Sequence, residues 1–194
     1  MVLPAKEKET TLMHGKAHHN RGAVVWLTGL SGAGKSTVAN QTAEQLHQLG
    51  FQTVVLDGDK LRLGLCADLG FSIADRNENV RRVGELAKLF LELGIVVLVA
   101  LVSPIRSARE KVKQSFPDNS FIEVYCSCPL SVCQARDPKG LYAKAMSGAI
   151  PEFTGLSSPY EAPLNPSLII DTSTESVEMA ANRLTQHLIS HLHD

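Results

Sequence analysis

The stretch GLSGAGKS, residues 29–36, fits the phosphate-loop pattern G-x-x-x-x-G-K-[ST] at every required position. An apolar run at residues 23–28 precedes it and is typical of a buried strand, and residues 35–49 carry apolar side chains at helical spacing. A glycine-rich turn before a helix can also arise from tight packing alone. The complete pattern between a strand and a helix favours a phosphate-binding loop.

The residue types of this loop suit a nucleoside triphosphate with Mg²⁺. Glycines allow backbone N–H groups to turn inward around phosphate oxygens, and the N-terminus of the following helix adds partial positive charge. We expect Lys35 to reach the β- and γ-phosphates and the Ser36 hydroxyl to face Mg²⁺. The loop by itself does not distinguish a kinase from a GTPase, a motor or a binding module.

The chain has 194 residues, of which 44% are hydrophobic, and a formal net charge of −1. Its charge lacks the basic excess that is typical of a nucleic-acid-binding protein. The N-terminus has no apolar segment like that of a signal peptide, and the longest apolar run, residues 95–102, is too short to span a bilayer. We therefore expect a cytoplasmic protein whose partners include neither nucleic acid nor membrane.

The four cysteines include one C-x-C pair, at residues 126 and 128, and no matching second pair. A structural metal site usually requires both pairs. Buried, reduced thiols are therefore favoured over a metal site.

Residues 1–21 are polar and show neither helical nor strand periodicity, so we expect a mobile N-terminal arm there. Residues 22–194 are expected to form a single domain, because no internal repeat or second domain is visible. Periodicity disappears again between Arg136 and Pro166, where Gly, Pro, Ser and basic residues are frequent. Such a long stretch inside a compact domain is usually functional, and we predict a lid over about residues 137–163.

Further apolar segments predict strands at residues 51–56, 95–102, 121–126 and 167–171, separated by helical patterns. These helices are expected at residues 75–93, from 103 toward 116, at 129–135 and after 175. Ser103 and Pro104 fit a helix N-cap and first residue, and Thr172 with Glu175 fits a capping box. The alternation predicts an α/β P-loop NTPase fold, with a five-stranded parallel sheet, helices on both faces and a lid segment.

Several residues after the second predicted strand are expected to form a site for a second substrate, which would be a small anion. Asp57 and Asp59 follow that strand directly. Because ligands of open parallel sheets lie at the carboxyl ends of the strands, we expect both acids to point at the same crevice as the phosphate loop. Arginine donates paired hydrogen bonds to phosphate or sulfate, and two arginines follow, Arg62 and Arg76. The base-reading Asn-Lys-x-Asp motif of a GTPase is absent, and the chain is short for a motor. The pattern therefore favours a small-molecule kinase.

Beyond the phosphate loop, the sequence resembles the adenylylsulfate (APS) kinase family in several separate motifs. They are LDGD at 56–59, DLGFS at 68–72, R-x-EN-x-RRVGE at 76–85, SP at 103–104, C-x-ARDPKGLY at 133–142, FTG at 153–155 and SPYEAP at 158–163. The resemblance covers about residues 20–175. It implies a homodimer that transfers the γ-phosphoryl group of ATP to the 3′-hydroxyl of adenosine 5′-phosphosulfate, giving 3′-phosphoadenylylsulfate for sulfate assimilation.

The resemblance also implies roles for individual residues. The ATP and Mg²⁺ side would comprise Gly29, Leu30, Ser31, Gly32, Ala33, Gly34, Lys35, Ser36, Thr37 and Arg136, with Ser36 at the metal. The acceptor side would comprise Asp59, Arg62, Phe71, Arg76, Asn79, Val102, Ser103, Lys139 and Phe153. Asp59 would accept the hydroxyl proton or hold a water on Mg²⁺, and the two phenylalanines would sandwich the acceptor adenine. Stacking of this kind contributes about 1–3 kcal/mol per base.

The resemblance implies that Ser103 is catalytic, as a phosphorylated intermediate, together with Lys35 and Asp59. Direct in-line transfer between two bound nucleotides needs no such intermediate, so an N-cap role for Ser103 is an equal alternative. Two positions depart from the family pattern, Ile105 in place of an aromatic residue and Lys60 in place of Asn. Neither departure removes a group assigned to the chemistry.

Two other functions remain as alternatives. One is a P-loop kinase that acts on a different small anion, such as a nucleotide or a sugar acid. The other is a nucleotide-binding module that has lost catalysis, for which damage at Lys35, Ser36 or Asp59 would be expected. All three residues are intact.

Overall fold

The computed structural model describes residues 22–193, so the predicted arm at residues 1–21 lies outside the described residues. Five strands form one sheet in the order β2-β3-β1-β4-β5, and every neighbouring pair is parallel. This confirms the predicted α/β fold with a five-stranded parallel sheet. The strands are β1 Val24–Thr28, β2 Thr53–Asp57, β3 Val96–Ala100, β4 Phe121–Ser127 and β5 Leu168–Asp171.

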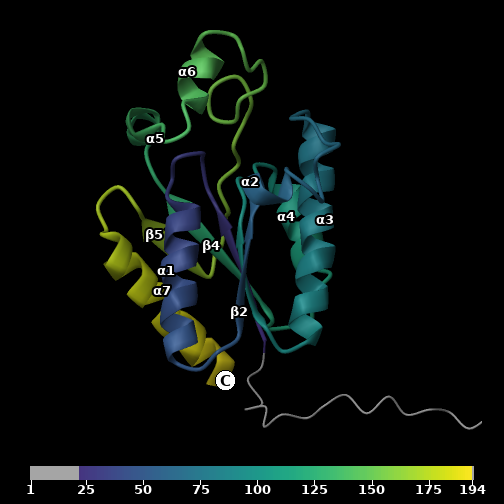
Figure 1. Ribbon diagram of the computed structural model, residues 1–194, viewed down its shortest axis with the longest axis vertical. Coiled ribbons are helices and arrows are strands. Elements are labelled where there is room, and N and C mark those ends of the chain that lie inside the picture. The colour runs from purple at the N-terminus through teal and green to yellow at the C-terminus, as the bar shows by residue number, and fades with distance from the viewer. Residues whose placement is uncertain (1–21, 194) are drawn as a thin grey trace, which may run out of the picture.

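Helices cover both faces of the sheet (Figure 1). α1 and α7 pack together on one face, and α3 and α4 lie on the other. Among residues 22–193, no helix has the length and hydropathy that a membrane crossing requires. The helices are α1 Lys35–Gln48, α2 Gly58–Leu61, α3 Ile73–Glu92, α4 Arg106–Lys113, α5 Leu130–Arg136, α6 Leu141–Met146 and α7 Val177–His193.

Strand β1 is apolar throughout because its side chains supply two cores. Val25 and Leu27 join the core under α1 and α7, whereas Val24 and Trp26 join the core under α3 and α4. All four side chains are 0% exposed. A strand buried on both faces has no polar alternation, which accounts for the continuous apolar run.

The phosphate loop joins β1 to α1 at the carboxyl ends of the strands, in the upper part of Figure 1. The 137–163 segment, which carries α6, lies over this end of the sheet. Helix α6 is short and was not expected from the sequence. The Asp137 carboxylate stabilises its first turn by accepting hydrogen bonds from the backbone N–H groups of Tyr142 and Ala143.

The predicted N-cap at Ser103 is wrong. Helix α4 begins at Arg106, and Ile105 occupies the N-cap position without a side-chain cap. Ser103 has a φ of 38°, in the left-handed region, whereas an N-cap residue needs extended backbone. Its hydroxyl is engaged elsewhere, because it accepts a hydrogen bond from the Trp26 indole. Tertiary contacts therefore override the local capping signal.

The predicted capping box of the last helix is also wrong. Thr172 donates its hydroxyl to the Ser127 carbonyl of β4, and Glu175 accepts from the Asp171 backbone N–H. Helix α7 starts later, and Ser176 caps it by accepting from the Met179 N–H at 3.2 Å. Both predicted capping side chains are thus hydrogen-bonded within the sheet edge and the turn after β5, before the helix begins.

Arg109 of α4 ties three parts of the chain together, although only 1% of it is exposed. Its guanidinium donates to the Glu123 carboxylate of β4 at 2.8 Å and to the carbonyls of Ser103 and Glu161, both at 2.7 Å. This buried cation therefore fixes the turn after β3 and the root of the 137–163 segment to the sheet.

We expect Arg109→Met to destabilise the protein by about 3–5 kcal/mol, because it leaves the Glu123 carboxylate and two carbonyls without their buried partner. Urea denaturation followed by circular dichroism measures the change. Arg81→Met is the matched control, since Arg81 pairs with Glu78 on the surface. The control should unfold near the wild-type midpoint, and equal losses in both variants would contradict the assignment.

Candidate active site

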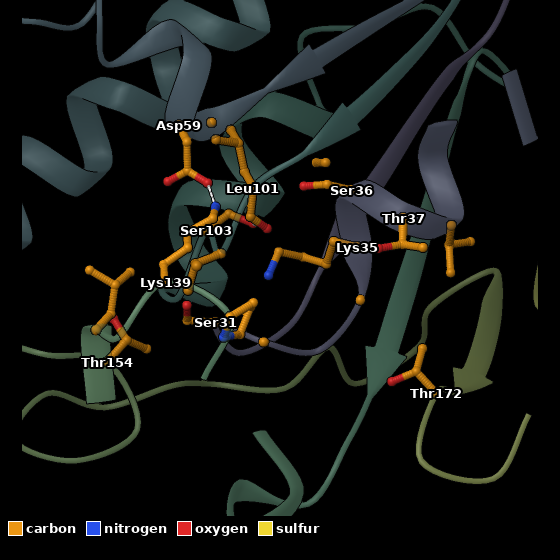
Figure 2. A pocket seen from close by; sticks show the side chains of 18 of the residues that line it. Ser31, Lys35, Ser36, Thr37, Asp59, Leu101, Ser103, Lys139, Thr154 and Thr172 are labelled. Carbon is orange, nitrogen blue, oxygen red and sulfur yellow. Dashed lines mark hydrogen bonds and ion pairs between the residues drawn. The ribbon is translucent and has the colours of Figure 1, made fainter. Parts of the chain in front are cut away.

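One cavity of about 860 Å³ lies between the phosphate loop, the ends of β2 and β3, and the 137–163 segment. Figure 2 shows side chains from all three regions facing it. Sixteen of the predicted site residues line the cavity, whereas Gly29, Leu30 and Ala33 do not. The sixteen are Ser31, Gly32, Gly34, Lys35, Ser36, Thr37, Asp59, Arg62, Phe71, Arg76, Asn79, Val102, Ser103, Arg136, Lys139 and Phe153.

The phosphate loop is packed closely against the sheet. A Cβ atom on Gly29 would lie 2.5 Å from the carbonyl oxygen of Cys126, so no side chain fits at that position. The first glycine is therefore needed for the close approach of the loop to β4, and it does not face the cavity.

All four cysteines are buried, as predicted.

Lys35 folds back over its own loop. Its ammonium donates to the carbonyls of Gly29 at 3.0 Å and Leu30 at 2.7 Å. Burial lowers the pKa of Lys35 to about 8. The cation is held among loop atoms at the edge of the cavity, where negative phosphate oxygens would relieve the desolvation that lowers its pKa.

Arg136 lines the part of the cavity where the phosphate loop meets the turn after β5, and it contacts both. Its guanidinium donates to the Thr172 carbonyl at 2.6 Å and to the Gly32 carbonyl at 3.4 Å. Glu175 and Ser176 line the same part. The sequence indicated only Arg136 for this part of the cavity, because Thr172 and Glu175 were assigned to a helix cap and Ser176 to no motif.

Two arginines surround the ring of Phe71 near the start of α3. The guanidinium carbon of Arg62 lies 4.4 Å from the ring centroid and that of Arg76 lies 5.5 Å from it. Arg76 also donates to the Glu152 carbonyl at 2.7 Å, which links α3 to the 137–163 segment. Positive charge and an exposed aromatic face therefore occur together, as recognition of an anionic nucleotide requires.

The two acids after β2 have different surroundings. The Asp57 carboxylate caps α2 by accepting from the N–H groups of Asp59 at 2.9 Å and Lys60 at 3.4 Å, and Asp57 does not line the cavity. The expectation that both acids face the crevice is therefore wrong for Asp57. Asp59 faces the cavity and forms an ion pair with Lys139 of the 137–163 segment (Figure 2).

Ser103 lines the cavity while its hydroxyl belongs to a buried hydrogen-bond network. It accepts from the Trp26 indole at 3.1 Å and donates to the Thr28 hydroxyl at 3.1 Å. The Thr28 hydroxyl also lies 3.1 Å from that of Tyr160 and donates to the Val102 carbonyl at 2.8 Å. These contacts hold the Ser103 oxygen in place beneath the cavity.

Three buried polar atoms of residues on the cavity wall have no hydrogen-bond partner in the described part of the chain, Asn79 Nδ2, Thr154 Oγ1 and Glu175 Oε2. Buried polar groups normally have partners, so these atoms are suited to a ligand. Asn79 was predicted from the family resemblance. Thr154 was not, although it lies in the FTG motif, because a sequence does not show that a hydroxyl is buried without a partner.

Comparisons with known proteins agree with this geometry. The sequence model of the family described as adenylylsulphate kinase matches residues 21–171. An adenylyl-sulfate kinase from Prochlorococcus marinus is 52% identical over 174 residues, covering 90% of this chain and 87% of that protein. Another from Shewanella denitrificans is 61% identical over 150 residues, covering 77% and 73%.

A solved structure is similar over nearly the same region. It is the APS kinase of Mycobacterium tuberculosis in complex with AMPPNP and APS, at 47% identity and a TM-score of 0.84, covering 87% of this chain and 98% of that one. The family match spans most of the described residues, and the relatives are matched over most of their own length. The chain belongs to the adenylylsulphate kinase family.

Proposed function

We propose that this chain is an ATP-dependent adenylylsulfate kinase. In this reaction the 3′-hydroxyl oxygen of adenosine 5′-phosphosulfate forms a bond to the γ-phosphorus of ATP, the bond from that phosphorus to the β–γ bridging oxygen breaks, and the products are 3′-phosphoadenylylsulfate, ADP and a proton. The observation that carries the proposal is the shared cavity, in which the phosphate loop and the arginine and phenylalanine cluster face one another. Family membership supports the same acceptor.

The donor phosphates would be bound by the loop N–H groups and Lys35. The Ser36 hydroxyl, half-buried at the start of α1 and on the cavity wall, fits Mg²⁺, which prefers oxygen ligands and usually shares them with nucleotide phosphates. Mg²⁺ held there would neutralise negative charge that develops on the phosphate oxygens during transfer. Lys35 would stabilise the same charge from the loop side.

The acceptor would be bound by charge and by stacking. Arg62 and Arg76 provide planar donors for the phosphosulfate group. Arg62 covers one face of Phe71, so a base that stacks on that face must first displace the guanidinium. Phe153 is 8% exposed and lines the same cavity, where it would supply the second ring.

Asp59 is the acid suited to receive the proton of the acceptor hydroxyl. It is paired with Lys139, so the 137–163 segment reaches across the cavity. In the proposed mechanism this segment is a lid, and Lys139 exchanges its contact with Asp59 for a contact with the bound acceptor. Closure would exclude water, which competes with the acceptor for the phosphoryl group.

A coupled assay for ADP release tests the proposal. Release should depend on added adenosine 5′-phosphosulfate, and Lys35→Met should lower kcat by about 10²-fold or more, since one preorganised charge is lost. Lys111→Met, on the exposed side of α4, is the matched control and should keep the wild-type rate. Release that follows a different anion would favour another kinase, and binding without release would favour a non-catalytic module.

We expect Ser103→Ala to keep kcat within about threefold, because direct in-line transfer needs no phosphorylated serine. The variant should lose about 1–3 kcal/mol of stability, since the Trp26 indole N–H loses its buried acceptor. Steady-state kinetics and urea denaturation measure the two effects, with the surface variant Ser115→Ala as control. A fall in kcat of about a hundredfold in a folded protein would instead favour a catalytic serine.

The proposed assembly is a homodimer, as the family resemblance implies. Sedimentation equilibrium should give a mass of about twice 21.0 kDa for the full chain. The mass of a single chain, or of a larger assembly, at micromolar concentration would contradict the dimer.

A further inference from the structure

Tyr142 lies in the first turn of α6 and bridges two parts of the site that are far apart in the sequence. Its side chain is 1% exposed, and its hydroxyl donates to the carbonyl of Ser31 in the phosphate loop at 2.9 Å. Burial raises the pKa of this hydroxyl, so it stays protonated at neutral pH and acts as the donor. The 137–163 segment is thereby bonded directly to the loop.

This hydrogen bond fixes the orientation of one peptide unit in the loop. A trans peptide is planar, so the Ser31 carbonyl and the Gly32 N–H of the same unit point in opposite directions. Tyr142 holds the carbonyl on the side of α6, and the N–H therefore points away from α6. The next carbonyl, of Gly32, is contacted by Arg136 in the same way.

The ring of Tyr142 also contacts the proposed acceptor site. The rings of Tyr142 and Phe153 pack edge to face, with centroids 4.8 Å apart and an interplanar angle of 74°. Phe153 is held in turn, because its N–H donates to the Ser157 hydroxyl at 2.9 Å and its carbonyl accepts from three following N–H groups. The backbone of Phe153 is thus fixed within its own turn, and its ring meets the Tyr142 ring from that position.

We propose that Tyr142 is a positioning residue that couples the donor and acceptor sites, through its hydroxyl on the Ser31 carbonyl and its ring on Phe153. This inference rests on the proposed function, in which Phe153 stacks on the acceptor adenine. Nucleotide phosphates that order the Ser31–Gly32 peptide would stabilise the hydrogen bond from the Tyr142 hydroxyl to the Ser31 carbonyl. Because the Tyr142 ring packs on Phe153, the same phosphates would also stabilise the position of the Phe153 ring. By linkage, an acceptor that orders Phe153 strengthens nucleotide binding by the same factor.

Calorimetric titration of adenosine 5′-phosphosulfate, with and without saturating AMPPNP, measures this coupling as a ratio of two dissociation constants. We expect a ratio of about fivefold or more for the wild-type protein. Tyr142→Phe keeps the ring contact with Phe153 and removes only the hydroxyl contact with Ser31. It should lower the ratio below about twofold, whatever change it makes to the two dissociation constants measured alone.

Tyr125→Phe is the matched control, because it removes a tyrosine hydroxyl from β4 outside the cavity lining and should keep the wild-type ratio. Titrating AMPPNP with and without adenosine 5′-phosphosulfate must return the same ratios. If Tyr142→Phe does not fold, Phe153→Leu tests the other end of the link, since it leaves the hydroxyl contact in place and should also lower the ratio.

The outcomes separate this inference from the proposed function. An unchanged ratio in a folded Tyr142→Phe protein, or a wild-type ratio near one, overturns the coupling while acceptor binding itself stands. A wild-type protein that does not bind adenosine 5′-phosphosulfate at all overturns the proposed function, and with it this inference.

Discussion

The site depends on how the carbonyl groups of the phosphate loop are satisfied. Four consecutive carbonyls, those of residues 29–32, each accept a hydrogen bond from a side chain: Lys35 for the first two, Tyr142 for the third and Arg136 for the fourth. A loop whose carbonyls have partners can present its N–H groups to an anion without leaving buried acceptors unpaired. Lys35, α5 and α6 therefore support the loop, and Gly29 provides its close approach to β4.

The sequence predicted most of the fold because its strongest signals are local. The two strands that are buried throughout, β1 and β3, gave continuous apolar runs, and the phosphate loop identified the first strand and helix. The strand order did not follow from these patterns, because pairing is decided by contacts between distant segments. Helix α6 was not predicted for a related reason. It is only six residues long, which is too short for a periodic signal, and its first turn is stabilised by the hydrogen bond from the Tyr142 N–H to the Asp137 carboxylate.

The candidate site was predicted mainly through separate motifs of the family resemblance, and less by residue chemistry alone. Asp57 and Asp59 show a limit of residue chemistry as a guide, because two acids on either side of Gly58 look alike in sequence and only Asp59 faces the cavity. Ser103 shows a second limit, which is that a local pattern can be overridden by distant contacts. Its sequence context fits a helix cap, whereas contacts with Trp26, Thr28 and Arg109 hold it in a left-handed conformation. Tyr142 joins residue 31 across 111 positions, and no local pattern reports such a contact.

The ion pair of Asp59 and Lys139 has a consequence for what the protein does when only ATP is present. Lys139 occupies one oxygen of the Asp59 carboxylate, so that oxygen is already engaged when a stray water lies beside the γ-phosphate. On the proposed mechanism, idle hydrolysis of ATP is therefore suppressed by the same two residues that prepare the transfer. On the same mechanism, the arriving acceptor would engage Lys139 and so free Asp59 when a hydroxyl is in place to use it.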